Sequence, residues 1–174
     1  MILNIPNTIT FMRLALLPLF AITLINSKLD YSLVIFIIMA LSDRIDGISA
    51  KLGKQVTEFG KSFDSFTDWS VFLTTFILLA VLGYIDSIWV LLLIFPVIMM
   101  LISKIIFLKK HKKIIVTMIA RISVGMAYVT IISILMDFIY QNQILILTFI
   151  LIYISMFKYL IMAYNFINSS KKAS

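Results

Sequence analysis

Cysteine is absent from this chain of 174 residues, histidine occurs once, and only eight residues are acidic. The absence of cysteine excludes disulfides and thiolate chemistry. A zinc site is not expected either, because zinc takes most of its protein ligands from cysteine and histidine. Acidic residues are so few that any cluster of them needs a physical explanation.

Hydrophobic residues, in contrast, make up 62% of the chain, and the mean hydropathy is +1.10. A soluble domain cannot hide this much apolar surface, so the composition predicts an integral membrane protein. A membrane-spanning helix needs about 20 apolar residues, and the sequence accommodates about six such helices. We therefore predict an all-α bundle of six transmembrane helices that forms one membrane domain over residues 1–174.

The expected spans follow from the apolar segments and the polar breaks between them. They cover residues 8–26, 31–52, 60–84, 88–108, 114–138 and 144–167. Leu29–Asp30 is predicted as a turn, Gly53–Phe59 as a polar loop that contains Glu58, and Asn168–Ser174 as a disordered tail. Pro96 should kink the fourth span. No basic region or cleavage site accompanies the first segment, so a retained helix is expected.

The net charge of +7 follows membrane topology and is not a nucleic-acid footprint. Basic residues gather in the loop with Lys54 and Lys61, in residues 109–113 and at Lys171–Lys172, whereas the alternate loops hold Lys28 or no basic residue. The positive-inside rule places the basic loops, and with them both termini, in the cytoplasm. We expect a multi-pass protein of the cell membrane with no nucleic-acid partner, as a monomer or a homodimer.

Four of the eight acidic residues stand at spacings of three and four in one short segment between strongly apolar stretches: Asp43, Asp46, Asp64 and Asp68. Carboxylates beside membrane spans are costly unless they have a partner, and they therefore indicate a functional site. The partner that four such carboxylates indicate is a cation.

Helical spacing arranges this segment into two stripes. The first stripe is formed by Asp43, Asp46, Gly47 and Ala50, and the second by Gly60, Asp64 and Asp68. Two antiparallel helices would bring the carboxylates together. Carboxylate oxygens suit Mg²⁺ or Mn²⁺, which also take oxygens from a substrate phosphate. The small residues beside them would let a nucleotide approach the backbone closely.

The segment matches the pattern D-x-x-D-G-x-x-A-R-x8-G-x3-D-x3-D and departs from it only at Lys51, where the pattern has arginine. This pattern is the signature of the CDP-alcohol phosphatidyltransferases, which the chain resembles on these residues. The resemblance implies a transferase of phospholipid biosynthesis. In such an enzyme the hydroxyl of an acceptor alcohol attacks the β-phosphorus of CDP-diacylglycerol, and CMP is displaced.

The resemblance also implies roles for individual residues. Two divalent ions, Mg²⁺ or Mn²⁺, would be held by the carboxylates of Asp43, Asp46, Asp64 and Asp68. Asp68 would in addition act as the general base for the acceptor hydroxyl. The CDP-lipid would be bound by Gly47, Ala50, Lys51 and Gly60. Lys51 would hold a phosphate as a point charge, without the bidentate fork of arginine.

The run Ile5-Pro6-Asn7-x-x-Thr10-x-x-Arg13 resembles the N-terminus of bacterial phosphatidylglycerophosphate synthases, and this favours glycerol 3-phosphate as the acceptor. A phosphorylated acceptor calls for basic residues, and the candidates are Lys104, Arg121, Lys112 and Lys113. Lys104 and Arg121 are predicted to be buried within spans, where a charge needs a reason. The second half of the chain departs from these synthases, so inositol phosphate, serine and phosphatidylglycerol remain alternative acceptors.

Arg13 has two interpretations, as a surface arginine that snorkels to the headgroups or as a residue that faces the protein interior. Two functions of other classes also stay open. An ion or proton transporter could use the carboxylates as a relay, although their position at one rim beside glycines argues against it. An inactive homologue could serve as a scaffold, although all four aspartates are retained.

Overall fold

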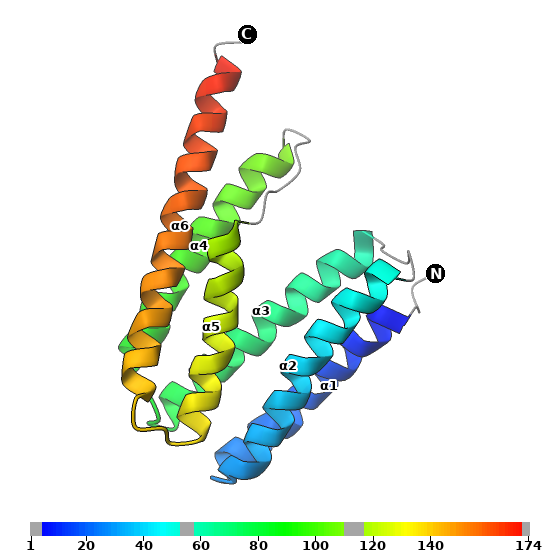
Figure 1. Cartoon of the computed structure of the whole chain (residues 1–174), viewed down its shortest axis with the longest axis vertical. Helices are drawn as coiled ribbons and strands as arrows, with labels where there is room; N and C mark the ends of the chain where they lie inside the picture. Colours follow the sequence, from blue (N-terminus) through cyan, green and yellow to red (C-terminus); the bar gives the residue numbers. More distant parts are fainter. Residues whose placement is uncertain (1–4, 53–57, 110–116, 172–174) are drawn as a thin grey trace. The chain divides into compact units, whose positions relative to one another are not determined.

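The computed structural model of the chain describes residues 5–52, 58–109 and 117–171, with the backbone alone at positions that include 43–52, 58–66 and 104–109 (Figure 1). The described residues form six α-helices: α1 (Ile5–Ile25), α2 (Leu29–Leu52), α3 (Glu58–Val81), α4 (Ile88–Lys109), α5 (Met118–Leu135) and α6 (Gln141–Lys171). The predicted all-α class is confirmed. The helix α4 continues through Pro96.

The helices α2 and α3 both begin two residues earlier than the sequence predicts, and an acidic residue lies at the start of each. The turn predicted at Leu29–Asp30 lies at Asn26–Lys28, where Ser27 adopts a φ of 55°, and α2 already begins at Leu29. Asp30 therefore lies in the first turn of α2. Glu58, predicted as a loop residue, is the first residue of α3. A negative charge is favoured at both places by the positive end of the helix dipole.

The helix α5 begins later than predicted, and its cap explains why. The side-chain oxygen of Thr117 accepts a hydrogen bond from the backbone N–H of Ala120 at 3.2 Å, which is the geometry of a helix N-cap. The helix therefore starts at Met118 and not at the predicted Ile114. Its last residue is Leu135, and Asp137 turns the chain with a φ of 49°.

The last helix is longer than the sequence predicts at both ends. The helix α6 runs over 31 residues from Gln141 to Lys171, whereas the predicted span covers residues 144–167. Part of the predicted disordered tail, Asn168–Lys171, is therefore helical. Polar residues at the ends of a membrane helix can continue the helix into the headgroup region. Hydropathy alone therefore predicts a helix that is too short.

Among the described residues, three helical segments are long and apolar enough to cross a membrane, namely Thr8–Ile25, Met118–Leu135 and Gln141–Asn165. Shorter apolar helical segments lie at Leu29–Ser42, Ser70–Val81 and Ile88–Met100. These lengths and compositions are those of a membrane protein.

Large apolar side chains lie on the outside of the helices, while many of the buried polar groups are hydroxyls. On α1, Phe11 is 65% and Met12 61% exposed. Most of the buried hydroxyls in the described part of the chain belong to threonine and serine, for example Ser32, Thr67 and Thr130. This distribution suits a lipid solvent, because lipid accepts apolar side chains and small hydroxyl residues let helices pack closely.

The contacts divide the chain into two compact units. The first consists of residues 1–86 with 134–138, and the second of residues 87–133 with 139–174. In the first unit, α1 packs against both α2 and α3. The rings of Phe20 and Phe36 lie 5.9 Å apart between α1 and α2, and the Ser32 hydroxyl donates to that of Thr23 at 3.0 Å. The beginnings of α1 and α3 and the end of α2 lie at the same end of this unit (Figure 1).

The second unit is held together by aromatic packing and by hydroxyl groups. The helices α4 and α6 pack together, with the rings of Trp89 and Phe149 4.8 Å apart. Between α5 and α6, the hydroxyls of Thr130 and Thr148 are hydrogen-bonded at 2.7 Å. The Ser123 hydroxyl donates to the backbone carbonyl of Leu151 at 3.1 Å. Each bond satisfies a polar group that lipid cannot solvate.

Candidate functional site

The aspartate signature lies at one end of the first unit. Asp43 and Asp46 lie in the C-terminal half of α2, and Asp64 and Asp68 lie in the N-terminal half of α3. The side chains of Asp43, Asp46 and Asp64 lie outside the described part of the chain, and so do those of the predicted CDP-lipid contacts Gly47, Ala50, Lys51 and Gly60. The roles of these residues stay predictions. Asp68 is the member of the set whose side chain can be followed.

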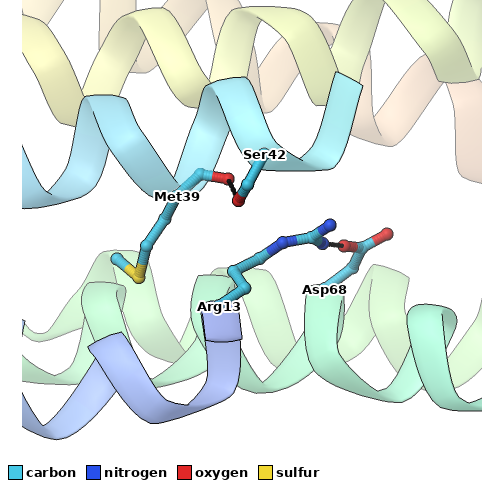
Figure 2. A network of polar contacts seen from close by, with 4 residues as sticks. All are labelled: Arg13, Met39, Ser42 and Asp68. Atoms are coloured by element: carbon cyan, nitrogen blue, oxygen red, sulfur yellow. Dashed lines mark hydrogen bonds and ion pairs between the residues drawn. The ribbon is translucent and has the colours of Figure 1, made fainter. Parts of the chain in front are cut away.

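Asp68 forms an ion pair with Arg13, in which Nη1 of the arginine donates to Oδ1 of the carboxylate (Figure 2). The pair joins α1 to α3 across 55 residues of sequence. The two partners differ in burial, because the side chain of Arg13 is 1% exposed and that of Asp68 is 35% exposed. The arginine is thus enclosed by protein, while the carboxylate keeps accessible surface.

This pair decides between the two interpretations of Arg13. A snorkelling arginine would be exposed, whereas Arg13 lies on the buried face of α1 that also carries Thr10 and Phe20. An arginine without a partner costs about 3 kcal/mol at the centre of a membrane helix and less toward an end, and a buried one needs an interaction that offsets its desolvation. The carboxylate of Asp68 offsets this cost. Sequence reasoning missed the pairing, although one basic residue inside the first span and one acidic residue inside the third were a usable signal.

The geometry of Asp68 is compatible with a role as a cation ligand. Asp68 lies beside a buried stripe of α3 formed by Thr67, Val71 and Thr75. One carboxylate oxygen contacts Arg13, and the other is directed away from it (Figure 2). A carboxylate can bind a metal ion through one oxygen while the other accepts hydrogen bonds. Among the side chains that the structure describes, no three His, Cys, Asp or Glu residues lie together as a metal site.

Arg121 is not the buried base that the sequence predicts. Its side chain is exposed, and it lies in the first turn of α5. The reason is the start of α5 at Met118, four residues later than predicted, which moves Arg121 from the helix interior to its end. The other candidate acceptor contacts, Lys104, Lys112 and Lys113, have side chains outside the described part of the chain.

Comparison with known proteins decides the family. The sequence model of the CDP-alcohol phosphatidyltransferases matches residues 3–163. The chain belongs to this family. The matched range includes Arg13, the four aspartates and Arg121, so the family resemblance predicted from the aspartate signature is confirmed.

One relative of this CDP-alcohol phosphatidyltransferase is the "CDP-diacylglycerol--glycerol-3-phosphate 3-phosphatidyltransferase" of Wigglesworthia glossinidia brevipalpis. The two sequences are 35% identical over 91 residues, which make up 51% of this chain and 49% of the relative. The chain thus matches about half the length of that protein.

Proposed function

We propose that this chain is a metal-dependent phosphatidyltransferase of phospholipid biosynthesis. It would transfer the phosphatidyl group of CDP-diacylglycerol to an alcohol and release CMP. The observation that carries the proposal is the complete aspartate signature inside the region that matches the family. The described geometry supports it, because Asp68 is ion-paired to the buried Arg13 while its own side chain stays 35% exposed.

The reaction assigns a definite task to Asp68. The oxygen of the acceptor hydroxyl forms a bond to the β-phosphorus, and the bond from this phosphorus to the bridging oxygen breaks. CMP leaves with the bridging oxygen and the electron pair, and Asp68 receives the proton of the hydroxyl. Asp43, Asp46, Asp64 and Asp68 would hold two Mg²⁺ or Mn²⁺ ions, which neutralise the charge that develops on the leaving phosphate.

The donor would be recognised by the residues between the aspartates. Gly47, Ala50 and Gly60 have side chains small enough for the cytidine and ribose to approach the helix backbone. Lys51 would contribute one positive charge to the pyrophosphate. Because lysine is a point charge with rotatable donors, its contact is less directional than that of the arginine in the family pattern.

Glycerol 3-phosphate is the acceptor that we favour. The name of the Wigglesworthia relative contains this molecule, and the run from Ile5 to Arg13 resembles synthases that use it. Arg121 is an exposed cation in the first turn of α5, and a helix N-terminus itself attracts a phosphate. Lys104, Lys112 and Lys113 are further candidates. Inositol phosphate, serine and phosphatidylglycerol are the alternatives within the same reaction class.

The six helices would each cross the membrane, with both termini and the aspartates at the cytoplasmic side. A reporter inserted at Lys110 and one fused after Ser174 should therefore both report the cytoplasm, and one inserted at Asn142 the opposite side. Alkaline phosphatase and a fluorescent protein, placed at the same three positions, give opposite signals for the two sides of the membrane. A cytoplasmic signal at Asn142 would contradict the six-span arrangement and the placement of the site.

The reaction itself is tested with purified protein in detergent micelles that contain CDP-diacylglycerol and Mg²⁺ or Mn²⁺. We expect CMP release that depends on an added acceptor and is matched mole for mole by a new phospholipid. Excess EDTA should abolish both signals, and added Mn²⁺ should restore them. Absence of CMP release with every acceptor would contradict the proposal and favour the inactive scaffold.

A further inference from the structure

We propose that Arg13 is a positioning residue for the reaction, which fixes the carboxylate of Asp68 so that its second oxygen faces the side of the site where the proposed function puts the metal ions and the acceptor hydroxyl. This inference rests on the proposed function, since it gives Asp68 the task of receiving the proton. It adds a residue of α1 to a site that the signature places on α2 and α3 alone.

The first argument is the burial of the arginine. Arg13 lies eight residues after the start of α1, close enough to a helix end for its long side chain to reach the headgroups. It is instead 1% exposed, although Phe11 and Met12 beside it are 65% and 61% exposed. A charged group that could be solvated but lies inside the protein needs an interaction there that offsets its desolvation.

The second argument is the unequal exposure of the pair. A contact that served only to join α1 to α3 would be expected to enclose both partners, as Thr130 and Thr148 are enclosed between α5 and α6. Asp68 is instead 35% exposed, and one of its oxygens is directed away from Arg13 (Figure 2). The arginine therefore holds the carboxylate from the protein side, while the side chain of Asp68 keeps exposed surface.

The third argument concerns what a guanidinium can do that other groups cannot. The carboxylate of an aspartate can rotate about two bonds, and a proton acceptor must be held within hydrogen-bond reach of its donor. Arginine is always charged, and its planar donors restrict the orientation of a carboxylate more than the ammonium of lysine does. Its charge also offsets part of the repulsion among the four aspartates that the signature gathers.

The test measures kcat and KM for CMP release by the wild-type protein, Arg13→Lys and Arg13→Gln. Values of kcat are expressed per folded molecule, counted from the monodisperse fraction. We expect Arg13→Gln to lower kcat about 100-fold, which is the lower range of a general-base contribution. KM for CDP-diacylglycerol should change by less than about threefold, and Arg13→Lys should restore kcat to within about tenfold of wild type.

Ser32→Ala is the matched control, because Ser32 is a buried polar residue of the same unit that bonds to Thr23 and to the Lys28 carbonyl. Its melting temperature should fall while kcat per folded molecule stays at the wild-type value. If Arg13→Gln behaves like this control, the ion pair is only structural and the inference is wrong. A raised KM with an unchanged kcat would overturn it as well, since Arg13 would then contact the donor.

Arg13→Lys keeps the inference testable when Arg13→Gln does not fold. A lowered kcat with an unchanged KM supports the proposal, and a wild-type kcat contradicts it. The wild-type protein in the same assay separates this inference from the proposed function. Wild-type turnover with a failed Arg13 result overturns the positioning role alone, whereas no turnover by the wild type with any acceptor overturns both.

Discussion

Replacement of any one of Asp43, Asp46, Asp64 and Asp68 by asparagine is expected to lower kcat for CMP release by about 1,000-fold. Asparagine keeps the size of the side chain and one oxygen but removes the negative charge that a divalent ion needs. In the proposed two-metal mechanism, an ion that lost a ligand would no longer neutralise the charge of the departing CMP. The effect should therefore appear in kcat as well as in the Mg²⁺ or Mn²⁺ concentration required for half-maximal rate.

Asp68→Asn is also expected to lower the stability of the protein. It removes a carboxylate that is ion-paired to Arg13, whose side chain is 1% exposed, and the loss of a buried ion pair is destabilising. We expect the melting temperature of Asp68→Asn to fall, and the double variant Arg13→Met/Asp68→Asn to regain part of the loss. Equal melting temperatures for Asp68→Asn and the wild type would contradict the pairing.

Asp30→Asn and Asp86→Asn are matched controls for the signature variants. Both aspartates are exposed and lie outside the signature, so their replacement should leave CMP release within about twofold of wild type. If the control and signature variants lost CMP release equally, the loss would come from the change in net negative charge and not from the signature positions. Full activity of the wild type in excess EDTA would refute the two-metal mechanism directly.

The helices could be predicted from the sequence because lipid restricts the structures that an apolar segment can form. Each apolar segment between polar breaks has to form a helix to satisfy its backbone in a membrane. Five of the predicted segments, for example residues 60–84 and 144–167, overlap the observed helices with shifted ends, and the fourth, residues 88–108, agrees within one residue. The shifts occur at polar residues such as Glu58 and Thr117, where local capping and charge decide the boundary and hydropathy does not.

The part of the proposed site that the sequence predicts lies within one segment. Asp64 and Asp68 are related by helical periodicity, which can be read directly from their spacing. The ion pair between Arg13 and Asp68 joins residues 55 positions apart. Such a contact depends on α1 packing against α3, and no local pattern encodes this packing. The burial of Arg121 was predicted wrongly for a related reason, since it depended on where α5 begins.

The acceptor is expected to be an anion, and a panel of single acceptors tests this. Purified protein with CDP-diacylglycerol and Mn²⁺ should form a new phospholipid with glycerol 3-phosphate and none with glycerol or serine. The physical reason is the excess of basic residues in the second half of the chain, which would attract an anionic acceptor. A product with serine or phosphatidylglycerol alone would contradict the acceptor and leave the transferase reaction intact.

Replacement of Arg121 should then locate the acceptor site. Arg121 is exposed in the first turn of α5, where its charge and the helix N-terminus both favour a phosphate. Arg121→Ala should raise KM for glycerol 3-phosphate about tenfold, corresponding to one charge-assisted contact, and leave KM for CDP-diacylglycerol unchanged. His111→Ala is the control and should change neither constant by more than about twofold. A rise in KM for the donor instead would place Arg121 at the pyrophosphate, and unchanged constants would move the acceptor site to Lys104, Lys112 and Lys113.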